Sequence, residues 1–204
     1  MKIVIVEYGM GNIRSIVSTL QYLGVQDVVL SSDFEILNSA DKIILPGVGS
    51  FGKAITQIRH RNIDNYLNEI VLENKKPILG ICLGMQLLGN SSTEDGNNKG
   101  LGYINGYVVK FDNSLVKVPH VGFNQVKVNN KLKLYNGFND IPTDFYFTHS
   151  FRMKSDVEIN QCYCNYQEDF VASFERDNIA GVQFHPELSQ TNGLKLLKNF
   201  IDKF

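Results

Sequence analysis

The chain has 204 residues, 43% of them hydrophobic, which suits a single large domain over residues 1–204 with a substantial core. Its 20 Lys and Arg residues balance 21 Asp and Glu residues, and the net charge of −1 provides no field to attract nucleic acid or an anionic membrane. No apolar run approaches the roughly 18 residues of a membrane span, so we expect a cytoplasmic protein that binds neither.

The first predicted unit is a strand at residues 3–6, followed by a glycine-containing turn and a helix at 13–23. The turn is similar to the start of a dinucleotide-binding fingerprint, and Asp33 lies near the position of a ribose-binding acid. However, Arg14 occupies the third glycine position of that motif, where its bulk would obstruct the packing of helix on strand. A nucleotide site therefore stays an alternative.

Two more strands are predicted at residues 28–30 and 42–45, and a long helix at 52–74. The loop at 46–52 contains three glycines, which leave its backbone free to aim N–H groups at an anion. A plain strand-to-helix turn is the alternative. The alternation of strand and helix predicts an α/β fold with a mainly parallel central sheet and helices on both faces, with ligands beyond the carboxyl ends of the strands.

Cys82 follows a buried strand predicted at residues 77–81 and precedes good helix formers. Gly80 and Gly84 allow a sharp strand-to-helix corner, as in a nucleophile elbow. At the start of the following helix, unpaired N–H groups and the helix dipole favour a thiolate and can stabilise an oxyanion. The alternative is a small core residue, but glycines on both sides of a packed cysteine have no packing rationale.

The second half of the chain is strand-like and predicts a smaller antiparallel β elaboration. A polar loop at residues 90–100 precedes it, and an amphipathic helix at 194–201 closes the chain. Cys162 and Cys164 flank Tyr163 as packing residues of one strand, so no disulfide framework is expected. The remaining predicted strands lie at residues 107–111, 125–128, 144–148, 170–174 and 179–184.

His185 and Glu187 stand at the end of the last of these strands, with a proline between them. This spacing fits a general base and the carboxylate that orients its ring and stabilises its charged form. The alternatives are a surface histidine or a metal pair, but a metal site needs another ligand, and none occurs at a recognisable spacing. We therefore expect neither a metal nor a cofactor.

Three motifs in this order resemble those of the class I, triad-type glutamine amidotransferases: residues 46–49, 80–86 and 183–187. Three further segments are similar to the family of glutaminase subunits of imidazole glycerol phosphate synthase, which serve histidine biosynthesis: residues 8–12, 119–124 and 147–151. The resemblance covers nearly the whole chain. It implies a flavodoxin-like fold and a heterodimer in which a glutaminase supplies ammonia to a cyclase, or synthase, subunit.

The resemblance also implies roles for individual residues. Cys82 would attack the side-chain amide of L-glutamine to give a thioester that water hydrolyses to glutamate, with His185 and Glu187 completing the triad. Backbone N–H groups would form the oxyanion hole, and several side chains would hold the substrate. The implied substrate-binding residues are Val48, Gly49, Leu83, Gln86, His149, Ser150 and Phe151.

The surface implied to face the synthase contains Asn12, Phe123, Tyr146 and Leu188. Here the chain departs from the family, because Val121 and Phe123 replace the usual Met and Trp and Leu188 replaces the usual Lys. A paralogous glutaminase that supplies ammonia to a different synthase, for example in sugar amidation, is therefore an alternative. A cysteine peptidase-like hydrolase with the same Cys–His pair and a non-catalytic binding module are further alternatives.

Overall fold

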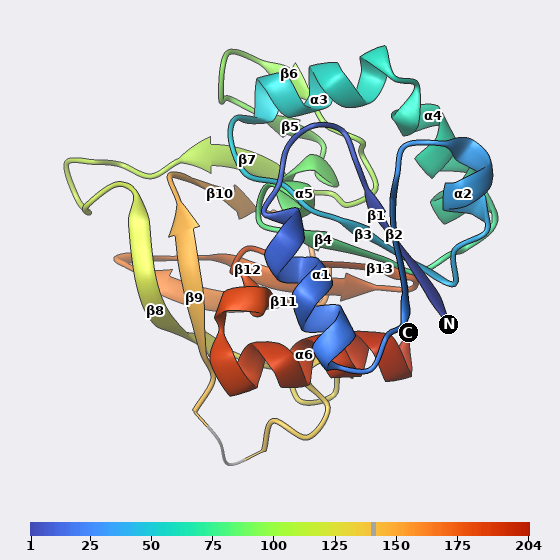
Figure 1. Cartoon of the computed structure of the whole chain (residues 1–204). Helices are drawn as coiled ribbons and strands as arrows, with labels where there is room; N and C mark the ends of the chain where they lie inside the picture. The colour runs from blue at the N-terminus through green and yellow to red at the C-terminus, as the bar shows by residue number, and fades with distance from the viewer. Residues whose placement is uncertain (140–141) are drawn as a thin grey trace.

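A hydrogen-bonded sheet of 13 strands runs through the computed structural model, which describes residues 1–139 and 142–204 (Figure 1). Five neighbouring strands of this sheet are parallel, as predicted. In spatial order they are β2 (Asp27–Ser31), β1 (Lys2–Val6), β3 (Lys42–Leu45), β4 (Ile78–Ile81) and β13 (Ile179–Val182). The predicted α/β fold class is therefore confirmed.

Both faces of the parallel strands are covered, which explains why these strands are continuous apolar runs. On one face, Ile3 and Ile5 of β1 pack with α1 (Ile13–Tyr22) and α6 (Gln190–Lys203). On the other face, alternate residues of the same strands pack against four helical segments and α5 (Leu83–Leu87). These segments are α2 (Phe34–Asn38), α3 (Phe51–His60), α4 (Ile63–Leu67) and the π-helical η1 (Asn68–Glu73).

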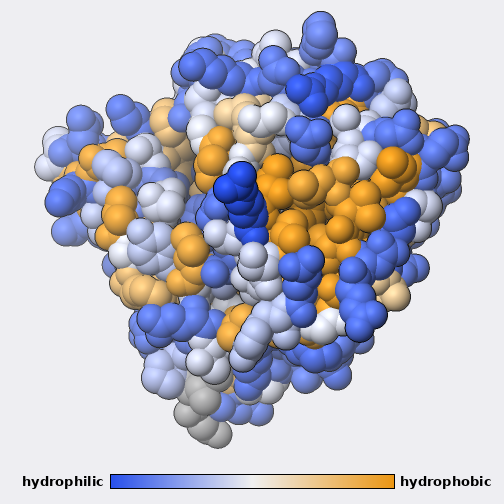
Figure 2. Space-filling view, in the orientation of Figure 1, coloured by the Kyte–Doolittle hydropathy of each residue, from blue (hydrophilic) through white to orange (hydrophobic). Residues whose placement is uncertain are grey.

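The cover is incomplete at the β2 edge. Figure 2 shows hydrophobic side chains at the surface beside α1, over the strands at this end of the sheet. Asp33, which the sequence offered as a ribose-binding acid, instead precedes α2, where its carboxylate accepts a hydrogen bond from the Ile36 N–H at 3.1 Å. The structure thus gives Asp33 a capping role.

The prediction of one continuous helix at residues 52–74 is wrong, because the structure divides this helical segment into α3, α4 and η1. Asn62 lies between α3 and α4 with a φ of +59°, a left-handed conformation that interrupts an α-helix. Asparagine is one of the few residues that adopt it readily.

Mainly antiparallel strands extend the sheet beyond β13, beginning with β12 (Glu168–Arg176), and only the pairing of β5 with β7 is parallel among the described strands of this part. One branch continues from β12 through β10 (Phe151–Lys154), β7 (Tyr107–Lys110), β5 (Ser91–Ser92) and β6 (Asn98–Lys99). The other runs through β11 (Gln161–Tyr166), β8 (His120–Lys127) and β9 (Asp144–His149). Two 3-10 segments, η2 (Lys133–Tyr135) and η3 (Pro186–Leu188), complete the described elements.

Within this half, β5 and β6 lie in the segment predicted as a polar loop, and β10 was not predicted. Strands of two to four residues are too short to show a period in the sequence. Cys162 and Cys164 are buried in β11 and both are free, as expected of packing residues. No helix in the described ranges is long and apolar enough to cross a membrane.

Candidate active site

A pocket of about 320 Å³ opens where β3 and β4 end. This is the position that ligands take in parallel α/β sheets. The structure brings Cys82 and all seven predicted substrate-binding residues to the pocket wall: Val48, Gly49, Leu83, Gln86, His149, Ser150 and Phe151. Glu94, Pro119 and Thr148 complete the lining.

Cys82 sits on a strained corner between β4 and α5, with φ of +53° and ψ of −109°. Its neighbours explain why the sequence requires glycine there. A Cβ on Gly80 would lie 2.7 Å from the Cα of Met85, and a Cβ on Gly84 would collide with the carbonyl oxygen of Leu45. The glycines therefore let α5 approach both strands closely, which holds the thiol at the pocket with its side chain 6% exposed.

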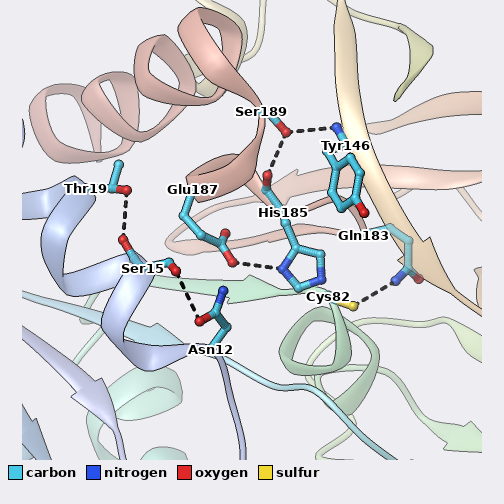
Figure 3. A network of polar contacts seen from close by, with 9 residues as sticks. All are labelled: Asn12, Ser15, Thr19, Cys82, Tyr146, Gln183, His185, Glu187 and Ser189. Carbon is cyan, nitrogen blue, oxygen red and sulfur yellow. Dashed lines mark hydrogen bonds and ion pairs between the residues drawn. The ribbon is translucent and has the colours of Figure 1, made fainter. Parts of the chain in front are cut away.

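The side chains of His185 and Glu187 form a buried pair beside Cys82 (Figure 3). His185 Nδ1 lies 2.9 Å from Glu187 Oε1, and the opposite ring nitrogen, Nε2, is turned toward the sulfur. Nε2 has no hydrogen bond of full geometry to any described residue. Burial lowers the pKa of His185, but the interactions with Cys82 and Glu187 outweigh it and raise that pKa to about 10.

The His185 segment is fixed by hydrogen bonds to β9. The His185 N–H donates to the Tyr146 carbonyl oxygen at 2.9 Å, and the Ser189 hydroxyl donates to the His185 carbonyl oxygen at 2.6 Å. The Tyr146 N–H in turn donates to Ser189 Oγ at 2.9 Å (Figure 3). Sequence reasoning missed Ser189, because the closing helix was predicted to begin at residue 194, whereas α6 begins directly after Ser189.

Gln183 is a second residue of the site that sequence reasoning left without a role. Its side-chain amide nitrogen lies 3.7 Å from Cys82 Sγ, and its oxygen accepts a hydrogen bond from Gln86 at 2.9 Å. The register of β13 against β4 pairs Val182 with Ile81, so Gln183 continues directly beside Cys82. The available signal for a role in the site was a polar residue, glutamine, directly after a fully apolar strand.

Glu94 is a third such residue. It lies in the segment predicted as a polar loop, yet its carboxylate borders the pocket and accepts a hydrogen bond from the Phe51 N–H at 2.9 Å. Burial raises the pKa of Glu94, and the Phe51 bond opposes that rise. Because Asp95 follows it directly, the sequence offered no reason to prefer one acid over the other.

His149 and His120 form a buried pair at the far side of the pocket. His149 Nδ1 lies 2.8 Å from the Phe151 carbonyl oxygen, which can only accept, so this nitrogen carries the proton. His149 Nε2 must then accept from His120 Nδ1, at 3.1 Å. Burial lowers the pKa of His149 to about 3 and that of His120 to about 4, so both rings are neutral at pH 7.

The four residues predicted to face a synthase lie on connected elements. Phe123 and Tyr146 are cross-strand neighbours on β8 and β9, with ring centroids 5.5 Å apart, and Phe123 is 50% exposed. Leu188 is 40% exposed in η3, which contacts both β9 and α1. Asn12 precedes α1 and accepts a hydrogen bond from Ser15. The structure thus places Phe123, Tyr146 and Leu188 around β9 and the His185 segment, with Asn12 at the start of α1, which also contacts η3.

In the part of the chain that the structure describes, no group of three or more His, Cys, Asp or Glu side chains could hold a metal ion. The polar groups at the pocket are instead a thiol, an imidazole–carboxylate pair, amides and one further carboxylate. This set suits nucleophilic attack on a neutral carbonyl compound, with an imidazole to move the proton.

Comparison with known proteins agrees with this geometry. The chain is 44% identical over 200 residues to "Imidazole glycerol phosphate synthase subunit HisH 1" of Campylobacter jejuni (strain RM1221), covering 98% of each chain. It is 42% identical to the HisH subunit of Aquifex aeolicus, covering 98% of this chain and 96% of the relative. A solved structure of PurLQS from Thermotoga maritima, 21% identical, shares the fold with a TM-score of 0.72 over 98% of this chain and 97% of that one. The model of the family described as glutamine amidotransferase class-I matches residues 4–204, and the chain therefore belongs to that family.

Proposed function

We propose that this chain is the glutaminase subunit of imidazole glycerol phosphate synthase, which hydrolyses L-glutamine and passes the ammonia to a cyclase subunit in a heterodimer. The observation that carries the proposal is the buried Cys82–His185–Glu187 arrangement at the wall of a pocket of about 320 Å³. The proposal is also supported by relatives, because the chain is 41–44% identical over nearly its whole length to several proteins named as HisH subunits. The cytoplasmic location expected from the sequence stays a prediction.

Glutamine binding is assigned to the polar groups of the pocket. The Glu94 carboxylate is the acid that borders it and suits the α-ammonium group of the substrate. Gln86 already donates both amide hydrogens, to Phe151 O and to Gln183 Oε1, each at 2.9 Å. It therefore offers the substrate only its oxygen, as an acceptor for an N–H group.

The acylation step follows from the triad geometry. Glu187 holds Nδ1 of His185, so Nε2 faces Cys82 and takes the thiol proton. Sγ then bonds to the carbonyl carbon of the substrate amide, and the C–N bond breaks as the imidazolium returns its proton to the leaving nitrogen, which departs as ammonia. Water activated by His185 hydrolyses the thioester, releases glutamate and restores the thiol.

The oxyanion formed in these steps requires N–H donors, for which we assign the backbone of Leu83 and of the Val48–Gly49 turn. Leu83 begins α5, where its N–H is free of intrahelical bonds. Gly49 has a φ of +111°, a conformation that side chains rarely adopt. The Met10 side chain packs against this turn, since a Cβ on Gly49 would lie 2.6 Å from Met10 Cε.

A glutaminase for a different synthase is the second candidate. The observation that favours it is the change at the proposed partner surface, where Val121, Phe123 and Leu188 are exposed. In addition, two relatives from one Methanococcus maripaludis strain are both named as HisH subunits, and they are 43% and 41% identical to this chain. Glutamine chemistry is the same in both candidates, and only the ammonia acceptor differs.

The experiment that tests the proposal measures glutamate release from L-glutamine by the purified chain, alone and with a histidine-pathway cyclase plus its nucleotide substrate. Strong stimulation by the cyclase is the expected result. Turnover of glutamine without any stimulation would assign the chain to another synthase. If the chain does not turn over glutamine and Cys82 does not react with a glutamine-like chloroketone, the glutaminase assignment is refuted.

A further inference from the structure

Gln183 is fully buried and does not line the pocket of about 320 Å³. Its amide nitrogen nevertheless points at Cys82 Sγ over 3.7 Å (Figure 3). A buried amide is costly unless its hydrogen-bonding groups are paired. The pairing found here directs one of the amide hydrogens to the reacting atom itself.

The orientation of the Gln183 amide is determined by its partners. The Phe151 carbonyl oxygen can only accept, so the Gln86 group 2.9 Å from it must be the NH₂ group. That same nitrogen lies 2.9 Å from Gln183 Oε1, which must then be the oxygen. A flip of either amide would place two acceptors or two donors against each other, and Gln183 consequently presents its NH₂ group to the sulfur.

We propose that Gln183 is a catalytic residue that stabilises the Cys82 thiolate and the thioester sulfur by donating an N–H···S hydrogen bond, and that Gln86 is a positioning residue that keeps the Gln183 amide oriented. The inference rests on the proposed function, in which Cys82 is the nucleophile. The thiolate is then held between two donors, the His185 imidazolium and the Gln183 amide. Hydrogen bonds to ionised groups are stronger than neutral ones, so the contact strengthens when the thiol loses its proton.

The test measures the rate at which iodoacetamide alkylates Cys82 as a function of pH, by mass spectrometry of the Cys82 peptide. This probe needs neither glutamine nor the partner, and Cys82 lines the pocket whereas Cys162 and Cys164 do not. Gln183→Met keeps the side-chain length without a donor. We expect alkylation at neutral pH to be about tenfold slower, with its midpoint about one pH unit higher. Gln183→Glu places an acceptor against the sulfur, and a larger shift is expected.

Two further variants separate this role from packing. Gln86→Met frees the Gln183 amide to rotate, and a smaller shift in the same direction is expected. Gln161→Met is the matched control, because Gln161 is also a strand glutamine with both amide groups bonded, to Ile159 N and Tyr163 Oη, but it does not line the pocket. Its alkylation profile should equal that of the unmodified chain. Circular dichroism and melting temperatures establish that each variant is folded.

The outcomes distinguish this inference from the proposed function. An unchanged pH profile in folded Gln183→Met, or equal profiles for the Met and Glu variants, would overturn the role of Gln183 while leaving the glutaminase assignment intact. With a cyclase present, the proposal further requires kcat of Gln183→Met to fall about tenfold with little change in KM. If the unmodified chain lacks glutaminase activity, the alkylation profiles still test the Gln183–Cys82 contact.

Discussion

The backbone N–H of His185 donates to the carbonyl oxygen of Tyr146 across 2.9 Å. The Tyr146 N–H is bonded in turn to Ser189, whose hydroxyl holds the His185 carbonyl oxygen. The ring of Tyr146 packs edge-on against Phe123, which is half exposed. A protein that binds over Phe123 therefore contacts a residue that packs against Tyr146, and Tyr146 is hydrogen-bonded directly to the segment of the proposed general base.

This relationship predicts that Phe123→Ala weakens binding of the cyclase. An exposed aromatic side chain at the centre of an interface typically contributes about 1.5–3 kcal/mol, so the Kd should rise about 10–150-fold. Titration calorimetry of the two subunits measures the change. Val157→Ala is the control, since Val157 is similarly exposed, at 46%, on the β10–β11 connection. Equal affinities for the unmodified chain and Phe123→Ala would remove Phe123 from the interface.

Strain at Cys82 predicts an unusual order of stabilities. The residue has φ of +53° and ψ of −109°, which glycine tolerates and other residues do not. Such strain costs on the order of 1–3 kcal/mol, more than the extra backbone entropy that glycine loses on folding. Cys82→Gly should therefore be more stable than Cys82→Ala by about 1 kcal/mol, and both should lack glutaminase activity. Chemical denaturation compares the two, and an alanine variant as stable as the glycine variant would argue against a strained corner.

The elements that place Cys82 could be predicted because their causes are local. Continuous apolar runs identify the parallel strands, and Gly80 and Gly84 identify the corner. Gln183 and Glu94 could not be assigned, because their roles depend on long-range placement. The pairing of β13 with β4 brings residues about 100 positions apart together, and the segment carrying Glu94 reaches the pocket through its bond to Phe51. The break at Asn62 was missed because a single left-handed residue leaves the apolar period around it intact.

Glu94→Gln should raise the KM for glutamine much more than it lowers kcat. The substitution keeps the size of the side chain but removes the charge to which we assign the substrate ammonium. A charge-assisted hydrogen bond contributes about 1.5–3 kcal/mol, which corresponds to a KM increase of about 10–150-fold. Steady-state kinetics with the cyclase present measure the effect. The neighbouring Asp95→Asn is the control because Asp95 does not line this pocket, and equal effects of both variants would contradict the assignment.

Replacing Glu187 should impair catalysis less than replacing His185. In Glu187→Gln an amide oxygen still accepts from Nδ1, so the ring stays oriented, but the carboxylate that helps raise the pKa of His185 is lost. His185→Ala removes the base itself, which typically contributes 10²–10⁴-fold. Single-turnover glutamate release compares the two variants, and circular dichroism checks the fold. A Glu187→Gln variant as inactive as His185→Ala would show that charge, rather than orientation, dominates the role of Glu187.

The neutral His149 predicts loss of stability in mild acid. Its folded-state pKa of about 3 lies below the ordinary value near 6.5, so between these pH values the unfolded chain binds a proton that the folded chain does not. The stabilising contribution is therefore complete above pH 6.5 and is lost as the pH falls below it, at about 1.4 kcal/mol per pH unit.

In the unmodified chain, His149 Nδ1 donates a hydrogen bond to the Phe151 carbonyl oxygen. The variant His149→Asn removes the titrating ring, but the amide nitrogen of the asparagine can still donate to the same oxygen. Urea denaturation between pH 7 and 5 should show a shallower fall in unfolding free energy for this variant than for the unmodified chain. His60→Asn is the matched control, because His60 is exposed at the end of α3, and its slope should equal that of the unmodified chain. Since His120 also carries a lowered pKa through burial, the slope of His149→Asn should stay above zero, and replacing both rings should lower it further. Parallel curves for His149→Asn and the unmodified chain would show that His149 gains no proton on unfolding in this range.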